Sequence, residues 1–309
     1  MKTSFQKTLI AASVGVAMFA AVSTASANSL LFPYFTTATG AQSVLSLSNT
    51  GAAPATQALH YVYNYGPACT HYDANGSLTA NDILSHSIAS PAAGGFGKVV
   101  GSDTSTPVYF PLAGQTGFLV VSSKSFAAND ALRGSMAIVD PTSGLVVSYP
   151  GIDNAAATNG AFGANGEGDF SGITDLNFPL TALPGGIVNT SWFGVIVGNM
   201  GPVITAGANW TGGVTFTNNG NIYNNDEVAY SGTAGKTITC SGTLATSDLA
   251  TSAQLAAVGG NGGLVKVTGT PVPATNATGV VLMKMQTVLP AVGAPFAGKM
   301  FLHREQAGL

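Results

Sequence analysis

The segment LHYVYNY, residues 59–65, decides the fold class of this 309-residue chain. Its aromatic and β-branched residues favour a β-strand, and the turn-forming pair Gly66-Pro67 ends it. Since side chains alternate between the two faces of a strand, Tyr61, Tyr63 and Tyr65 share one face. The segment therefore predicts a strand with a row of tyrosine rings along one side.

Similar short apolar or alternating segments recur along the chain, with turn residues between them. They are residues 43–48, 117–121, 135–139, 145–149, 191–197, 213–217, 236–240, 264–267 and 280–288. The turn sequence Asp140–Gly144 separates two of these segments and predicts a β-hairpin. Short strands joined by turns predict an all-β protein, an antiparallel β-sandwich of the immunoglobulin-like or jelly-roll-like kind.

Helical signals are confined to two short segments. Thr246 or Ser247 can cap a short helix that Gly259-Gly260 would end. Thr79 or Asn81 can cap a single helical turn. Neither segment is long enough to organise the fold, so we expect one or two short helices beside the sheets.

The first 27 residues have the order of a secretory signal peptide. Two lysines precede an apolar run, Leu9–Ala21, and the small residues Ala25 and Ala27 follow it. The apolar run is shorter than the roughly 20 residues that span a bilayer. We therefore expect cleavage after Ala27 and export of residues 28–309 to the cell surface, the extracellular space or the periplasm, with no transmembrane helix in the mature chain.

The mature chain is acidic and poor in charge. Thirteen acids and eight lysines and arginines follow residue 27, a net charge of −5. This balance argues against nucleic acid, whose phosphates bind basic clusters. Charged residues are 7% of the chain, against about 25% in ordinary globular proteins, and such a surface is poorly protected against association. We expect partners to be other copies of the chain or components of an envelope or matrix; the alternative is a secreted β-protein under lenient solubility requirements.

The two cysteines bear on domain organisation. An exported chain is a suitable place for a disulfide, so we expect Cys69 and Cys240 to pair; two buried free thiols are the alternative. Residues 151–172, rich in Gly, Ala and Asn, are typical of a long loop or linker. A bridge would tie together the halves on either side, so we expect one β-rich unit over 28–309, with a possible subdivision at 151–172.

The tyrosine row allows two interpretations. Rings at Tyr61, Tyr63 and Tyr65 can stack on sugars or other planar ligands if the face is exposed. The alternative, which we favour, is a half-buried face whose phenol groups reach water or protein partners.

Three groups of acidic and amide residues make Ca²⁺ a conceivable cofactor. They are residues 73–82, the pair Glu167 and Asp169, and the pair Asp226 and Glu227 beside Asn224 and Asn225. In the first group Gly76 stands fourth, whereas the calcium loop of an EF-hand has glycine at the sixth position. A turn at residues 73–76 followed by a helical turn explains that group as well, and we favour it.

No catalytic motif is present in the sequence. Residues 69–73 combine Cys, His and Asp, but a zinc site needs a second close pair of ligands. The chain has no G-x-S-x-G motif and no glycine-rich loop between a strand and a helix. We assign no catalytic, cofactor-binding or metal-binding residues.

Four segments resemble parts of uncharacterised secreted proteins of Gram-negative bacteria. They are residues 31–37 (LFPYFTT), residues 46–51 (SLSNTG), the tyrosine-rich strand before Cys69, and residues 135–154 (SMAIVDPTSGLVVSYPGIDN). The resemblance implies export and a β-rich surface protein. It implies no activity and no site residues.

These observations favour an exported, non-enzymatic structural or adhesion protein of the cell surface or extracellular space. One alternative is a secreted carbohydrate-binding module or hydrolase that uses the tyrosine face. A second is an outer-membrane β-barrel, although the strands are short and residues 300–309 do not form a typical C-terminal aromatic strand.

Overall fold

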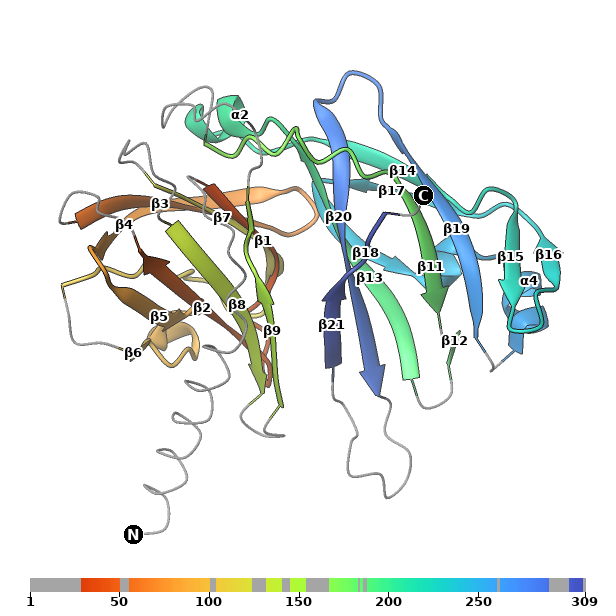
Figure 1. Ribbon diagram of the computed structural model, residues 1–309, viewed down its shortest axis with the longest axis horizontal. Coiled ribbons are helices and arrows are strands. Elements are labelled where there is room, and N and C mark those ends of the chain that lie inside the picture. Colours follow the sequence, from red (N-terminus) through yellow and green to blue (C-terminus); the bar gives the residue numbers. More distant parts are fainter. Residues whose placement is uncertain are drawn as a thin grey trace, which may run out of the picture. The chain divides into compact units, whose positions relative to one another are not determined.

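The computed structural model describes residues 29–50, 56–100, 104–123, 132–140, 145–153, 167–182, 184–185, 188–259, 262–288 and 300–307. The predicted signal peptide lies outside these residues. Strands dominate, and adjacent strands in every sheet run antiparallel. The predicted all-β class and sandwich architecture are confirmed (Figure 1).

The chain folds into two compact units. Unit 1 comprises the chain up to Gly66, Thr70–Phe170 and Asn199–Asn209, and unit 2 comprises the remainder. Each unit contains two sheets. The largest division between the units, at Phe170, falls within the stretch 151–172 that the sequence marked as a possible subdivision.

Unit 1 contains two five-stranded sheets, which we call the β3 sheet and the β2 sheet. The β3 sheet has the order β10 (Ile152–Asp153), β1 (Ser29–Thr36), β7 (Thr116–Ser123), β3 (Thr56–Tyr65), β4 (Thr70–Thr79). The β2 sheet has the order β6 (Lys98–Val100), β5 (Ile83–Ser87), β2 (Gln42–Asn49), β8 (Leu132–Asp140), β9 (Leu145–Pro150). A 3₁₀ turn, Pro91–Ala93, and the short helix α2, Gly201–Thr205, complete the unit.

The tyrosine face of β3 lies in the core between these two sheets. Tyr61 and Tyr63 are fully buried, and the Tyr63 ring packs edge-on against Phe35 of β1 at 5.6 Å between centroids. Tyr61 lies 6.2 Å from the His86 ring of the opposite sheet. Gly134 makes room for Phe32, since a Cβ at Gly134 would come 2.9 Å from that ring. Close packing of aromatic rings therefore joins the two sheets.

A proline in β1 explains an irregularity of the β3 sheet. The register between β1 and β7 shifts between Phe32 and Phe35, next to Pro33, which has no N–H to donate. At this bulge the backbone of Tyr34 turns to Tyr149 of the opposite sheet. The Tyr149 hydroxyl accepts from Tyr34 N at 3.2 Å and donates to Tyr34 O. A side chain thus satisfies the backbone groups that the bulge removes from the ladder.

Unit 2 also contains two sheets, which we call the β19 sheet and the β13 sheet. The β19 sheet has the order β16 (Ala229–Ser231), β15 (Asn221–Asn224), β19 (Gly263–Pro271), β14 (Gly213–Thr217), β17 (Gly235–Thr239), with β11 (Asn177–Ala182) also paired to β19. The β13 sheet has the order β12 (Pro184–Gly185), β13 (Val188–Gly198), β20 (Ala277–Val288), β21 (Met300–Arg304), with β18 (Ser241–Ala245) also paired to β13.

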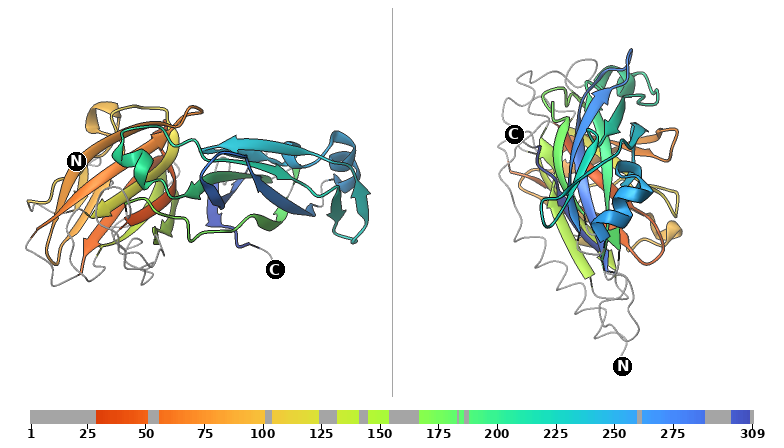
Figure 2. Two further views of the ribbon diagram at one scale, coloured as in Figure 1. Left: turned by 90° about the horizontal axis from the view of Figure 1, so that it is seen from above. Right: turned by 90° about the vertical axis from the view of Figure 1, so that its right-hand side faces the viewer.

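Both sheets of unit 2 contribute to a continuous apolar core. Trp192 of β13 and Phe216 of β14 are fully buried within it. The predicted helical segment forms two short helices, α3 (Thr246–Leu249) and α4 (Ser252–Val258). Figure 2 shows α4 beside β15 and β16, where Leu255 packs against the core. No helix among the residues described is both long and apolar enough to cross a membrane.

Two local predictions are wrong. Residues 73–76 lie within β4 and form no turn, because the register between β3 and β4 is continuous from Thr56 opposite Thr79 to Tyr65 opposite Thr70. The helical turn expected after Asn81 is absent, since β5 begins at Ile83. Pairing with neighbouring strands overrides the local turn chemistry in both places.

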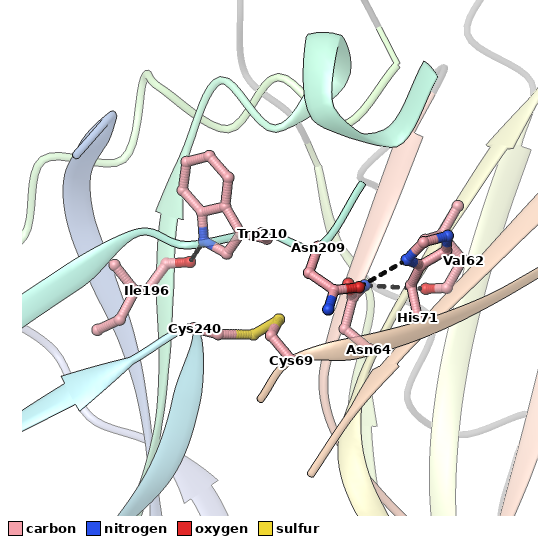
Figure 3. Close-up of a disulfide and its surroundings, with 8 residues drawn as sticks. All are labelled: Val62, Asn64, Cys69, His71, Ile196, Asn209, Trp210 and Cys240. Carbon is pink, nitrogen blue, oxygen red and sulfur yellow. Dashed lines mark hydrogen bonds between the residues drawn. A yellow bond between two sulfur atoms is a disulfide. The ribbon is translucent and has the colours of Figure 1, made fainter. Parts of the chain in front are cut away.

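The predicted disulfide joins Cys69, in the turn between β3 and β4, to Cys240, between β17 and β18 (Figure 3). Their Cα atoms are 5.8 Å apart, and both residues are buried. The turn Pro67–Cys69 belongs to unit 2, so both cysteines lie in that unit.

We predict that replacing both cysteines with serine destabilises unit 2. A crosslink across 171 positions lowers the conformational entropy of the unfolded chain. This stabilises the folded state by up to about 5 kcal/mol. Cys69 and Cys240 have φ angles of 52° and 63°, which glycine adopts without strain. Calorimetry should therefore show a lower unfolding temperature for C69S/C240S and a smaller loss for C69G/C240G. Unchanged unfolding of both variants would contradict a stabilising bridge.

Candidate functional site

A row of polar residues crosses the outer face of the β3 sheet. Ser29 of β1, Ser122 of β7 and His60 of β3 stand in register on neighbouring strands. Alternation along β3 places His60 on the face opposite the buried tyrosines. The Ser29 and Ser122 hydroxyls are 2.7 Å apart and bond to one another.

Two segments of unit 1 lie over this row. Gly168 N donates to Ser29 Oγ at 3.3 Å, and Met200 N donates to Gly168 O at 3.0 Å. An isolated antiparallel bridge joins Asp169 to Asn199. A Cβ at Gly201 would come 2.4 Å from Glu167 O, so glycine permits the close approach of α2. Residues 167–170 and 199–201 therefore pack together, and Gly168 joins them to the sheet.

Three titratable side chains meet where this cover touches the sheet. The buried Glu167 carboxylate contacts His60 Nδ1 directly. On the other side of the ring, His60 Nε2 lies 3.6 Å from the Asp73 carboxylate of β4. The Glu167 side chain is 2% exposed, that of His60 is 11% exposed and that of Asp73 is 43% exposed. We call Glu167, His60 and Asp73 the histidine cluster.

The electrostatics of the histidine cluster follow from the burial of Glu167. A buried carboxylate is costly unless a positive or hydrogen-bonding partner compensates for its lost hydration. His60 supplies that partner, and a carboxylate lies on each side of its ring. The cluster therefore fastens residues 167–170 to β3 through the contact between His60 and Glu167.

The arrangement lacks the geometry of nucleophilic catalysis. Such a site needs a hydroxyl or thiol bonded to the histidine that activates it. The Ser29 and Ser122 hydroxyls hydrogen-bond to each other instead, and Ser29 Oγ also accepts a hydrogen bond from Gly168 N. Both ring nitrogens of His60 face carboxylates. The geometry favours a structural fastening.

The tyrosines singled out by the sequence have different environments. Tyr61 and Tyr63 are inside the unit 1 core, so neither ring is presented to a ligand at the surface. The Tyr63 hydroxyl donates to Val108 O at 2.7 Å. Tyr65 is half-buried, and its ring packs against Phe110 with the centroids 4.9 Å apart. A sugar-stacking face on β3 would therefore lack two of its three rings.

His86 is a buried titratable group that the sequence did not single out. It lies on β5, and its Nδ1–H donates to Ser87 O at 2.9 Å. Its Nε2 and the Tyr61 hydroxyl have no hydrogen-bond partner within the described structure. Burial lowers the pKa of His86 to about 4, the Ser87 carbonyl opposes that shift, and the charge of Lys98 adds to it. His86 is therefore neutral at pH 7.

Of the residues considered for Ca²⁺, Asp73 and Glu167 lie on either side of the His60 ring. In the turn after β15, Asn224 Oδ1 already accepts from Asp226 N and Val228 N, at 3.0 and 2.9 Å. Asp82 receives hydrogen bonds from Thr79 and Ser105. Across the part of the chain that the structure describes, no three His, Cys, Asp or Glu side chains are arranged to hold a metal ion.

Unit 2 contains a second buried polar group that sequence reasoning missed. Lys284 of β20, 7% exposed, donates to Thr181 Oγ1 at 2.8 Å and lies 3.6 Å from Glu305. The same carboxylate accepts from the indole nitrogen of the buried Trp192 at 3.0 Å. Glu305 follows β21 directly, so these contacts attach the last described strand to the β13 sheet.

Two hollows of unit 2 offer little for catalysis. One, of about 30 Å³, lies beneath α3 and α4 and is lined mainly by apolar side chains, among them Trp192 and Leu255. The other, of about 390 Å³, lies over β11 and β19, where Asn177, Lys266 and Thr268 provide polar groups. No carboxylate or histidine lines either hollow, so neither contains an acid–base pair.

Comparison with known proteins gives no family assignment. No protein-family model matches the chain, and no curated protein matches it. The function has to be inferred from the chain's own residues and fold.

We predict that the histidine cluster stabilises unit 1. His60→Gln removes the imidazole that contacts the buried Glu167 carboxylate and should cost about 1–3 kcal/mol. The double variant H60Q/E167Q removes the charge as well and should cost less than H60Q alone. Urea denaturation measures both, with His71→Gln as a control at a more exposed histidine of the same unit. Additive effects of the two substitutions would contradict the coupling.

We predict that His86 makes unit 1 sensitive to acid. Its folded pKa lies below the usual 6.5, so the unfolded chain binds the extra proton between pH 6.5 and pH 4. The stability of unit 1 should fall by about 3 kcal/mol as pH decreases through that window. His86→Gln does not titrate and should flatten this part of the pH profile. An equally steep profile for H86Q in chemical denaturation would refute the assignment.

Proposed function

We propose that this chain is an exported, non-enzymatic protein of the cell surface or extracellular space that acts by adhesion and self-association. The observation that carries the proposal is the surface left by the two sandwiches. Exposed strands such as β17 (GKTIT) present hydroxyls and backbone edges, and the whole chain is only 7% charged. Such a surface offers little repulsion between molecules.

The disulfide supports the exported location. Disulfides persist in oxidising compartments and are rare in the cytosol. Cys69 and Cys240 are both paired, and both are buried. This fits the signal peptide expected from residues 1–27.

The absence of a catalytic arrangement at the sites described above supports a non-enzymatic role. The hydroxyls of Ser29 and Ser122, the described serines in register with His60, bond to each other, and no carboxylate lines the two hollows of unit 2. The carbohydrate-binding alternative loses support because Tyr61 and Tyr63 are core residues. Changing either to alanine would damage the fold itself, so glycan binding by such variants would not be interpretable.

We predict that the mature chain, residues 28–309, associates with itself or with envelope material. Sedimentation velocity over a hundredfold concentration range should show an increasing sedimentation coefficient. Pelleting with cell-envelope fragments should deplete the protein from solution, whereas a monomeric acidic protein of similar size stays soluble. A strict monomer that pellets with no envelope or matrix material would overturn the proposed function.

A further inference from the structure

The edge strands of the described sheets differ in how well they are protected. Natural proteins shorten, bend or interrupt edge strands, because an open edge can pair with another chain. β10 and β12 have two residues, β6 and β16 have three, and β17, β18 and β21 have five. β9 has six residues and ends at Pro150. These edges offer short templates for pairing.

β4 is the exception among them. It has ten residues, contains no proline, and pairs with β3 along its whole length without a bulge (Figure 1). Near its end the far side is occupied, since Ser77 and Thr106 exchange backbone hydrogen bonds of 3.1 and 3.0 Å. The part of β4 from His71 to Asp73 is therefore a regular edge of the β3 sheet.

The Ser77–Thr106 pair shows which groups of β4 point outward. Outward and inward backbone groups alternate along an antiparallel edge, so the N–H and C=O groups of His71 and Asp73 point away from β3, as those of Ser77 do. No described residue forms a backbone hydrogen bond with His71 or Asp73 on that side. Asp73 is exposed, and His71 is half-exposed.

We propose that β4 is a self-pairing edge through which two copies of this chain join their β3 sheets, an inference that rests on the self-association in the proposed function. The two β4 strands run antiparallel about a two-fold axis at Tyr72. His71 of each copy then stands opposite Asp73 of the other. Each such pair exchanges two backbone hydrogen bonds.

Charge selects this register over its neighbour. Centring the axis on Asp73 would put two carboxylates directly opposite each other, which destabilises a strand pair. Centring it on Tyr72 gives two His–Asp pairs on the same face of the sheet. Ser77 is already paired with Thr106, so the joined segment ends before that residue. A second copy thus fits the edge in both length and charge.

Cysteine crosslinking tests the register. Across the proposed axis the two residues at position 72 form a non-hydrogen-bonded pair with Cα atoms about 4.5 Å apart, within reach of a disulfide. Tyr72→Cys should therefore yield a covalent dimer on mild oxidation of the mature chain. Ala74→Cys is the matched control on the same strand, because its two copies would lie about 14 Å apart along the edge.

A charge test does not depend on Tyr72, whose ring packs against Tyr63 and Phe110. His71→Asp places a carboxylate opposite Asp73 of the second copy and should weaken self-association about tenfold. His71→Lys places a positive charge opposite Asp73 of the second copy and should not weaken self-association. Both variants lose the same hydrogen bond to Asn209, so the comparison isolates the charge.

The outcomes separate the edge from the proposed function. Dimers of Y72C but not A74C, with association weakened by H71D and not by H71K, support the self-pairing edge. Self-association that is unaffected by H71D, with no crosslink at position 72, overturns the edge and leaves the proposed function standing. Crosslinking to another envelope protein in place of a second copy also overturns it. A monomer without envelope binding overturns both.

Discussion

The alternation of side chains along β3 is the constraint on which the rest of unit 1 depends. One face carries Tyr61 and Tyr63, whose rings fill the space between the sheets. The other carries His60, which holds the buried Glu167 against the sheet. A shift of register by one residue would bury His60 among aromatic rings and expose the tyrosines. The core packing on one face of β3 and the histidine cluster on its other face therefore require the same register of this strand.

The same register determines what β4 presents. Because β3 is paired along its length, β4 aligns with it residue by residue and continues as a straight edge. His71 and Asp73 then fall on the face that carries His60, and their backbone groups point outward. A local turn at Asp73–Gly76 would have removed this edge. Long antiparallel pairing thus creates both a stable sheet and an open template at its border.

The sequence predicted those features that depend on neighbouring residues along the chain. The strand at residues 59–65, the antiparallel pairing of the segments before and after residues 141–144, and the short helix at Thr246 all follow from periodicity and turn residues. Residues 141–144 themselves lie outside the described residues. Features that depend on distant partners were missed. His60 and Glu167 are 107 positions apart, and nothing near either residue marks the other as its partner. The pattern of Asp, Asn and Gly in β4 indicates a turn locally, and only pairing with β3 overrides it.

Some of the few charged residues of this chain are buried inside its two units. Glu167 is buried against His60, Lys284 is buried beside Glu305, and Asp169 is buried in the cover of the β3 sheet. The contacts of Glu167 and Lys284 each fasten one segment to a sheet, and the three buried groups contribute little to repulsion at the surface. A mature chain with thirteen acids and eight basic residues therefore exposes even fewer charges than its composition indicates. Charged residues that lie inside the units hold segments to the sheets. Because they are then missing from the surface, the surface is poorly protected against association.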